Sequence, residues 1–115
     1  MAPLKLAVVQ ITPEFGKKKD NLARMQKLVE GVSADIFVFP ELCTTGYLFL
    51  SRNEVASVAE TAFGQSADFF RNLAKRQNAV IVAGFAEKDN DKLYNSCLVV
   101  VPDECAVRDF EIGKQ

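Results

Sequence analysis

The spacing of apolar residues is the feature of this 115-residue sequence that most constrains its fold. Nearly continuous apolar runs, rich in Val, Ile and Phe, have the composition of buried strands, and they span residues 4–11, 35–39, 79–85 and 93–101. Other segments repeat their apolar residues at helical intervals, and they span residues 20–32, 51–62 and 66–77. This alternation predicts an α/β layered domain in which helices cover a sheet.

Cap and turn residues indicate where these elements begin and end. Asp20 is suited to be the N-cap of the first helix, and Ser66 that of the third. Ser51 has Glu54 three residues later, which is the spacing of a capping box for the second helix. The polar residues 88–92 predict a tight turn, so we expect the last two strands to form an antiparallel hairpin.

Each helical segment places apolar side chains on one face, which we expect to pack on the sheet. These side chains are Leu22, Met25, Leu28, Val29 and Val32 in the first helix, Val55, Val58 and Ala59 in the second, and Phe69, Phe70, Leu73 and Ala74 in the third.

The charge and apolar content exclude some classes of partner. The net charge is −1, so nothing favours nucleic acid or an anionic membrane surface. No apolar run approaches the roughly 20 residues of a membrane span. Lys5 interrupts the first apolar run, and no small-residue cleavage site follows, so the start is not typical of a signal peptide. We therefore expect a cytoplasmic protein.

Histidine is absent and cysteine is sparse, which limits the available chemistry. Without histidine the chain cannot build a Ser-His-Asp or Cys-His site or the usual zinc sites, so a general base must be Asp, Glu, Lys or Tyr. The cysteines are Cys43, Cys97 and Cys105, an odd number without a CxxC pair. This usage is typical of reduced thiols.

The stretch FVFPELCTTGY, residues 37–47, places a carboxylate where a buried strand ends. Ligands of α/β sheets gather outside the carboxyl ends of the strands. Pro40 restricts the backbone before Glu41, and Gly46 permits a sharp bend after it. Aromatic and apolar neighbours would partly desolvate Glu41, which favours a base at the floor of a pocket. An ordinary surface glutamate, or one that caps the next segment, is the simpler alternative.

Four segments, in the order in which the family has them, resemble the amino-terminal part of the nitrilase, or carbon–nitrogen hydrolase, superfamily. They are LKLAVVQITP (4–13), DNL (20–22), FVFPELCTTGY (37–47) and GFAEKDNDKLYNSCLVVVPD (84–103). The resemblance covers residues 1–103, less than half of a complete family domain, and leaves residues 104–115 as a divergent tail. In that tail Val107, Phe110 and Ile112 follow neither a strand nor a helix period.

The resemblance implies a nitrilase-like four-layer α-β-β-α sandwich, of which this chain is an incomplete amino-terminal half. It implies hydrolysis of a C–N bond in a small amide, carbamoyl compound or nitrile by a Glu-Lys-Cys triad. Glu41 matches the general base of the family's FPE motif. No metal or organic cofactor is expected. A homo-oligomer, or pairing with a full-length relative, is the expected assembly.

The rest of the triad departs from the family pattern. Lys114 lies near the expected place of the oxyanion lysine but lacks its flanking motif. No cysteine lies where the family has its nucleophile: Cys43 and Cys97 are expected to be apolar fillers, and Cys105 falls in the tail. We therefore expect the 115-residue chain to be inactive alone. A non-catalytic partner of a full-length relative is the alternative, and a nucleotide-binding module is disfavoured because no Gly-rich phosphate loop occurs.

Overall fold

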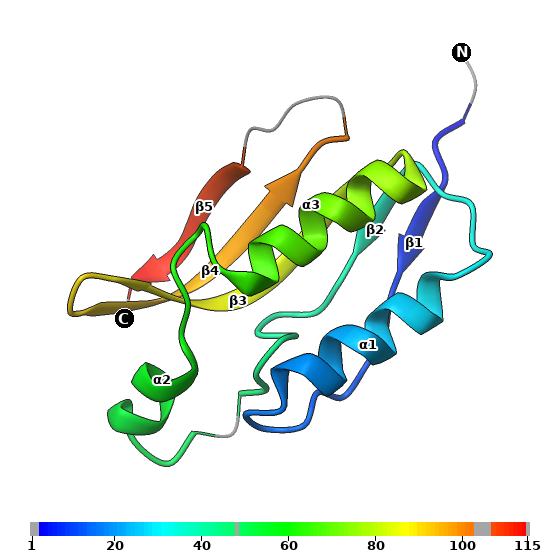
Figure 1. Ribbon diagram of the computed structural model, residues 1–115. Coiled ribbons are helices and arrows are strands. Elements are labelled where there is room, and N and C mark those ends of the chain that lie inside the picture. Colours follow the sequence, from blue (N-terminus) through cyan, green and yellow to red (C-terminus); the bar gives the residue numbers. More distant parts are fainter. Residues whose placement is uncertain (1–2, 48, 103–106, 115) are drawn as a thin grey trace.

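A single mixed sheet organises the chain (Figure 1). The computed structural model describes residues 3–47, 49–102 and 107–114, the last segment by its backbone. Within these residues the strands follow the order β1-β2-β3-β4-β5 and are β1 (Leu6–Val8), β2 (Ile36–Val38), β3 (Val80–Asp89), β4 (Lys92–Val100) and β5 (Val107–Lys114). The pairs β1–β2 and β2–β3 are parallel, whereas β3–β4 and β4–β5 are antiparallel. The α/β class and the predicted β3–β4 hairpin are confirmed.

The helices occupy the three predicted segments with different ends, and they are α1 (Lys18–Val29), α2 (Arg52–Val58) and α3 (Gln65–Gln77). Only the predicted Ser51 cap is confirmed, since its hydroxyl accepts from the backbone N–H of Glu54 at 3.2 Å. Asp20 lies in the first turn of α1, whose N-cap is Lys17, so it is not the cap. Ser66 is not a cap either, because α3 begins one residue earlier and Gly64 is its N-cap.

Two helices stop before the ends predicted from periodicity. Gly31 adopts a φ of 75°, so α1 cannot continue to residue 32. The chain leaves α2 at Ala59 because the next residue, Glu60, pairs with β3: its backbone N–H donates to the carbonyl oxygen of Ala86 at 3.0 Å. The predicted continuation of α2 to residue 62 is therefore wrong.

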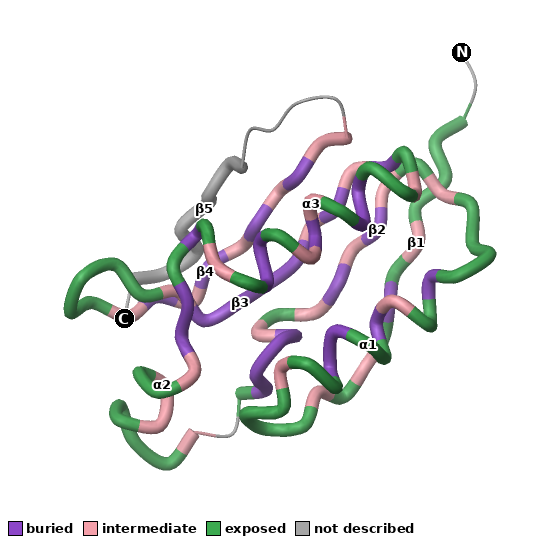
Figure 2. Tube along the Cα trace, viewed as in Figure 1, coloured by how far each residue is buried: buried purple, intermediate pink, exposed green. Residues whose placement is uncertain are grey.

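The core lies between one face of the sheet and the helices α1 and α3, which lie side by side on that face (Figures 1 and 2). Its largest fully buried side chains are Met25, Val29, Phe37, Phe70, Leu73, Ile81, Leu98 and Val100. Most predicted helix contacts are confirmed, but Leu28 is exposed because it lies outside the buried stripe of α1, and Val32 is exposed because α1 ends before it. Val55 and Val58 are half-buried, since α2 packs beside the sheet rather than over it.

The opposite face of the sheet is apolar and lacks a covering helix in the described part of the chain. Side chains alternate along each strand, so residues in register share a face. Val8, Val38 and Val82 lie in register across the parallel strands, and Val99 faces Val82 from β4. Val8 is 71% exposed, and the other three are half-buried. We call this surface, with Leu6, Ile36 and Val80, the open face.

The tail contains a strand that its sequence period does not predict. Residues 107–114 form β5, which pairs with β4 in antiparallel register from Val100↔Val107 to Tyr94↔Lys114. Pairing along an existing strand edge, rather than an apolar period, defines this strand. The expected domain division at residue 103 stays a prediction.

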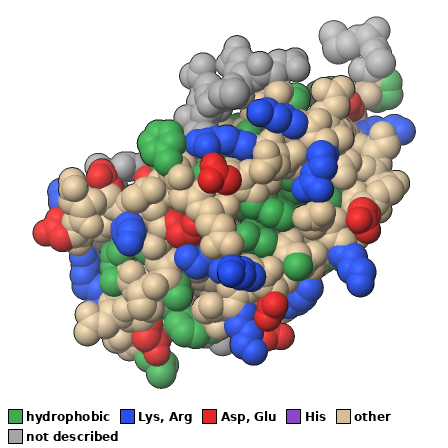
Figure 3. Space-filling model, viewed as in Figure 1, with side chains coloured by type: hydrophobic (Ala, Val, Ile, Leu, Met, Phe, Trp, Pro, Cys, Tyr) green, Lys and Arg blue, Asp and Glu red, His purple; other side chains and the backbone are tan. Residues whose placement is uncertain are grey.

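The helix side of the molecule has the character of a solvent-facing surface. Figure 3 shows Lys, Arg, Asp and Glu side chains spread over α1 and α3, with apolar groups between them. The longest helix among the described residues, α3, has 13 residues, and no helix there could cross a bilayer.

Candidate active site at the carboxyl end of β2

Glu41 lies on a turn that begins where β2 ends and folds back on β3. The backbone N–H of Phe39 still donates to the carbonyl oxygen of Val82 at 2.8 Å, as in a parallel ladder. Beyond it, the N–H of Gly84 donates to the Pro40 oxygen at 3.2 Å, and the N–H of Cys43 donates to the Gly84 oxygen at 3.0 Å. Backbone bonds on both sides of Glu41 therefore hold its Cα against the sheet.

Gly84 makes this close contact between the turn and β3 feasible. A Cβ at Gly84 would lie 2.7 Å from the Cα of Glu41 and 2.8 Å from the backbone nitrogen of Leu42. Both atoms belong to the backbone, so they cannot swing aside. Leu42 itself has a φ of 48°, a left-handed conformation that is unfavourable for a branched apolar residue. The chain thus accepts local strain immediately after Glu41.

Asn95 of β4 orients the carboxylate of Glu41. Its side-chain amide donates to Oε1 of Glu41, although the two residues are 54 positions apart in sequence. The next residue, Ser96, donates to Oε1 of Glu87 on β3 at 2.6 Å. Two consecutive residues of β4, Asn95 and Ser96, therefore each donate a hydrogen bond to a carboxylate, one on each side of the sheet.

Glu41 is exposed within the described part of the chain, so the expectation that its carboxylate is partly desolvated is wrong there. Two features account for this. Tyr47, an aromatic neighbour in sequence, is 64% exposed, and the open face of the sheet has no cover beside Glu41 among the described residues.

Glu41 lines two hollows. The larger has a volume of about 440 Å³, within the size range of small-molecule sites, and is lined by Glu41, Leu42, Tyr47, Phe49, Arg52, Val55, Ala86, Leu93, Tyr94 and Asn95. The smaller has a volume of about 200 Å³ and is lined by Phe39, Glu41, Gly84, Asn95, Ser96 and Cys97. Glu41 and Asn95 line both hollows, so the hydrogen bond between these two residues lies where the hollows adjoin.

The described cysteines differ in their access to this site. Cys43 is fully buried, as expected for a filler, and its thiol donates to the Gly84 oxygen at 3.3 Å. Burial raises the pKa of Cys43 to about 12. Cys97 was expected in the core, but it is half-buried and lines the smaller hollow with Glu41, because its position in β4 faces away from the helices. Burial also raises the pKa of Cys97. Cys105 lies outside the described residues.

Lys114, the candidate oxyanion lysine, lies in β5. Its Cα pairs with that of Tyr94, a residue of the larger hollow, so its backbone is at the same end of the sheet as Glu41. An irregularity in the β4–β5 register falls between Tyr94 and Ser96, beside Asn95. The catalytic role of Lys114 stays a prediction.

Sequence reasoning assigned no role to Asn95 or Arg52. Asn95 belonged to a matching segment, and the predicted hairpin could have suggested that it returns toward Glu41. Arg52 had only the capping box of α2 as a signal, because the place of α2 beside the hollow depends on tertiary packing. Within the described residues no three His, Cys, Asp or Glu side chains gather as a metal ion would require.

The chain is similar to known proteins both in sequence and in structure. The sequence pattern of the family described as carbon-nitrogen hydrolase matches residues 5–109. A nitrilase of Pyrococcus abyssi is 40% identical over an alignment of 103 residues, which covers 86% of this chain and 39% of that protein. An omega-amidase of Danio rerio is 36% identical over 108 residues, covering 90% of this chain and 37% of that protein.

A solved N-terminal amidase with a Gln-Gly peptide superposes with a TM-score of 0.86 at 27% identity, covering 94% of this chain and 27% of that one. The chain thus spans about two fifths or less of the length of these relatives.

Proposed function

This chain belongs to the carbon–nitrogen hydrolase family, and we propose that it supplies the general base, Glu41, of an amidase- or carbamoylase-type site. One observation carries the proposal: Glu41 is held by backbone bonds and by Asn95 at the edge of a hollow of about 440 Å³. A base that is already oriented loses little freedom when a substrate binds. The substrate class is a small amide or carbamoyl compound.

The proposed chemistry follows from the charge of Glu41. Its carboxylate takes the proton of a cysteine thiol, and the sulfur forms a bond to the amide carbon. The amine then leaves with a proton, and water hydrolyses the thioester to the acid and the free thiol. A lysine beside the carbonyl oxygen stabilises its developing negative charge. The register of β5 supports Lys114 for this role, since it brings the Lys114 backbone across from Tyr94.

Neither described cysteine suits the nucleophile's role. The thiolate is the attacking form, and burial raises the pKa of both Cys43 and Cys97. Cys43 is also sealed from both hollows. We therefore propose that the 115 residues do not turn over an amide alone, and that a cysteine outside the described residues is the nucleophile. A cytoplasmic location belongs to this proposal, supported by the free thiols.

The test is to capture the endogenous protein with an antibody to α1, weigh it intact, and assay release of ammonia from a panel of small amides. We expect a mass well above 12.7 kDa together with activity. Glu41→Gln should lower activity by at least about a hundredfold, whereas Glu30→Gln, at the exposed end of α1, should leave it unchanged. Activity that survives Glu41→Gln would overturn the proposal.

A non-catalytic partner role is the second candidate, and the open face favours it. An uncovered apolar sheet face is a surface that another chain could bury. An endogenous mass near 12.7 kDa with co-purification of a full-length relative would support this role. A longer, active protein would exclude it.

A further inference from the structure

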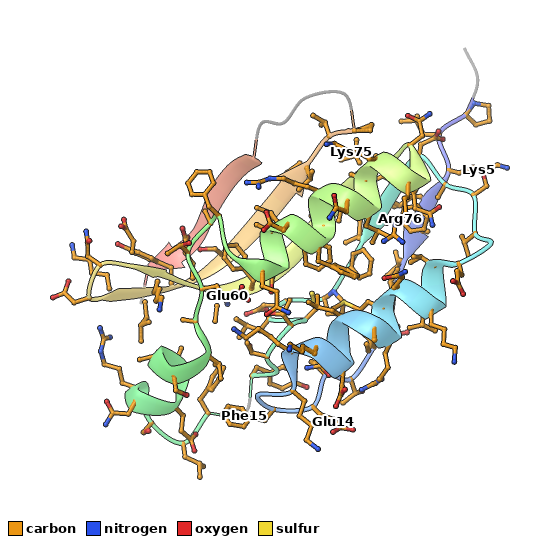
Figure 4. All side chains as sticks on the ribbon, in the orientation of Figure 1. Lys5, Glu14, Phe15, Glu60, Lys75 and Arg76 are labelled. Carbon is orange, nitrogen blue, oxygen red and sulfur yellow. The ribbon has the colours of Figure 1, made fainter. Side chains whose placement is uncertain are left out.

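The turn that carries Glu41 has a second support besides β3, on the side of α1. Asn21 is fully buried in the first turn of α1. Its amide nitrogen donates to the carbonyl oxygens of Glu14 at 2.8 Å and of Thr44 at 2.9 Å. Its amide oxygen accepts from the backbone N–H of Glu14 at 2.9 Å. One side chain therefore joins α1 to the loop before it, where Figure 4 labels Glu14, and to the turn after Glu41.

These three bonds explain why position 21 holds an asparagine. An amide has two N–H donors as well as an acceptor oxygen, and all of them are used here. The Glu14 backbone presents one donor and one acceptor, which determines how the amide is oriented. An ionised aspartate would lack both donors. Asparagine is a poor helix former, so its partners, rather than the helix, account for it.

The carbonyl group of Thr44 depends on Asn21 because water cannot replace the bond. Thr44 is only 1% exposed, and an unpaired buried carbonyl group is unfavourable. The loop before α1 packs on the same turn, since the N–H of Gly16 donates to the Thr45 oxygen at 3.1 Å. Loop and turn therefore meet backbone to backbone, and Asn21 is bonded to both.

The turn needs support on two sides because it is strained. Leu42 is in a left-handed conformation, and such a conformation persists only where its surroundings hold it. The bonds to β3 fix Pro40 and Cys43, and Asn21 fixes Thr44, the next residue. Without the bond from Asn21, the turn could relax and carry the Glu41 carboxylate out of its place.

We propose that Asn21 is a positioning residue for Glu41: by fixing Thr44 on α1, it directs the Glu41 carboxylate toward Asn95 and the larger hollow. Its effect on catalysis rests on the proposed function, whereas its effect on the turn does not. Asn21 is fully buried and lines neither hollow that contains Glu41. It would not touch a substrate there, so we expect it to affect kcat rather than KM.

The first test follows amide exchange by NMR in the isotope-labelled full chain. Asn21→Asp keeps the size of the side chain and removes both donors, and Asn21→Ala removes all three bonds. The Cys43 N–H lies in the turn, whereas the Phe39 N–H lies in the ladder with β3. In both variants the ratio of the Cys43 exchange rate to the Phe39 rate should rise at least about tenfold. This ratio cancels a general loss of stability.

The side-chain amide signals of Asn95 give a second readout from the same samples. Asn95 donates to Glu41, so its signals should shift in both variants when the carboxylate moves. In the unmodified chain, the side-chain N–H protons of Asn21 should exchange at least about a hundredfold more slowly than those of the exposed Asn53. That measurement tests the inference even if neither variant folds.

Met25→Ala is the matched control. Met25 lies one turn later on α1 and is also fully buried, but its side chain forms no hydrogen bond to the turn. The truncation should lower the stability of the chain. It should leave the exchange ratio and the Asn95 signals unchanged.

The second test introduces the same variants into the endogenous protein and measures amide hydrolysis. Asn21→Asp and Asn21→Ala should lower kcat at least about tenfold and keep KM within about twofold, because a displaced base loses rate without losing contacts to the substrate. Met25→Ala should keep the kcat of the folded protein.

The outcomes separate the two proposals. An unchanged exchange ratio, unshifted Asn95 signals, rapid exchange of the Asn21 amide, or a raised KM at unchanged kcat would overturn the role of Asn21 and leave the proposed function standing. If the unmodified endogenous protein hydrolyses no amide, the proposed function fails, and the exchange ratio still decides whether Asn21 positions the turn.

Discussion

Gly84 controls how closely the turn that carries Glu41 can approach the sheet. The carboxylate is useful as a base only if its Cα stays where Asn95 can reach the side chain. Backbone packs directly on backbone at this point, with the position of a Cβ at Gly84 lying 2.7 Å from the Cα of Glu41. The residue that matters most for the geometry of Glu41 is therefore one without a side chain.

Gly84→Ala should lower the free energy of unfolding by about 1–3 kcal/mol, because the added methyl group forces the turn away from β3. The same change should break the Asn95–Glu41 bond, visible as altered side-chain amide signals of Asn95. Gly31→Ala is the control: nothing lies within 4 Å of its Cβ position, so only its φ of 75° contributes a cost, about 1 kcal/mol. Wild-type stability in Gly84→Ala would contradict this account.

The burial of Cys43 leads us to predict that the free energy of unfolding depends on pH. Burial raises its pKa from 9.0 to about 12 in the folded chain. Between these values the unfolded chain loses the thiol proton and the folded chain keeps it. The Cys43 contribution is therefore present below about pH 9 and falls as the pH rises toward 12. Urea unfolding across this range should show a smaller decline for Cys43→Ala than for the unmodified chain. Equal declines would refute the burial argument.

At the scale of elements, Glu60 joins three parts of the fold. It lies in the segment between α2 and α3, where Figure 4 labels it. Its carboxylate accepts from the backbone N–H of Ser66 at 3.0 Å and from the Ser66 hydroxyl, and it pairs with Lys18 of α1 at 3.3 Å. Its backbone bonds to β3, where the N–H of Lys88 donates to the Glu60 oxygen at 2.8 Å. One residue thus connects α1, α3 and β3.

Glu60→Gln should lower the free energy of unfolding by about 2–3 kcal/mol, since a nearly buried charge with several donors is replaced by a neutral group. The Glu60 side chain is 10% exposed. Glu14→Gln is the matched control, because its pair with Lys17 is 60–62% exposed and should contribute close to nothing. Urea denaturation measures both variants. Equal effects would show that the Glu60 cluster contributes no special stability.

At the scale of the whole molecule, the open face sets the behaviour of the isolated chain. One layer of helices covers one face of the sheet, and the other face presents in-register valines. Burying such a surface is favourable, so an isolated chain gains by associating through it. The fold matches a partial nitrilase-like sandwich, as its superposition on a solved N-terminal amidase shows.

We expect the isolated chain to self-associate at micromolar concentrations, and Val8→Lys to shift it toward the monomer. Val8 is 71% exposed, so the lysine should disturb folding little. Leu50→Lys is the control: Leu50 is 91% exposed but precedes α2 and belongs to no strand of the sheet. Sedimentation velocity measures the masses. A monomeric unmodified chain, or equal effects of the two variants, would contradict the role of the open face.

Local patterns in the sequence are sufficient to predict β1–β4 and the helices, but not all of the residues at which these elements begin and end. The apolar runs and helical spacing predict β1–β4 and the three helices, and the Ser51 capping box predicts the start of α2. Asp20 and Ser66 are equally good caps by residue type. Ser66 instead meets the Glu60 carboxylate, a contact that no local rule contains.

The sequence by itself determined the fold class and the position of Glu41 at the end of a buried strand, because both depend on residues close together in the chain. Only the tertiary structure decided what surrounds Glu41. Asn95 reaches it through the register of the β3–β4 hairpin. Arg52 lines the larger hollow because of the packing of α2, and Cys97 lines the smaller one because of the direction in which its side of the strand faces. These residues lie 11 to 56 positions from Glu41 in the sequence, so strand pairing and helix packing, rather than local sequence, bring them together.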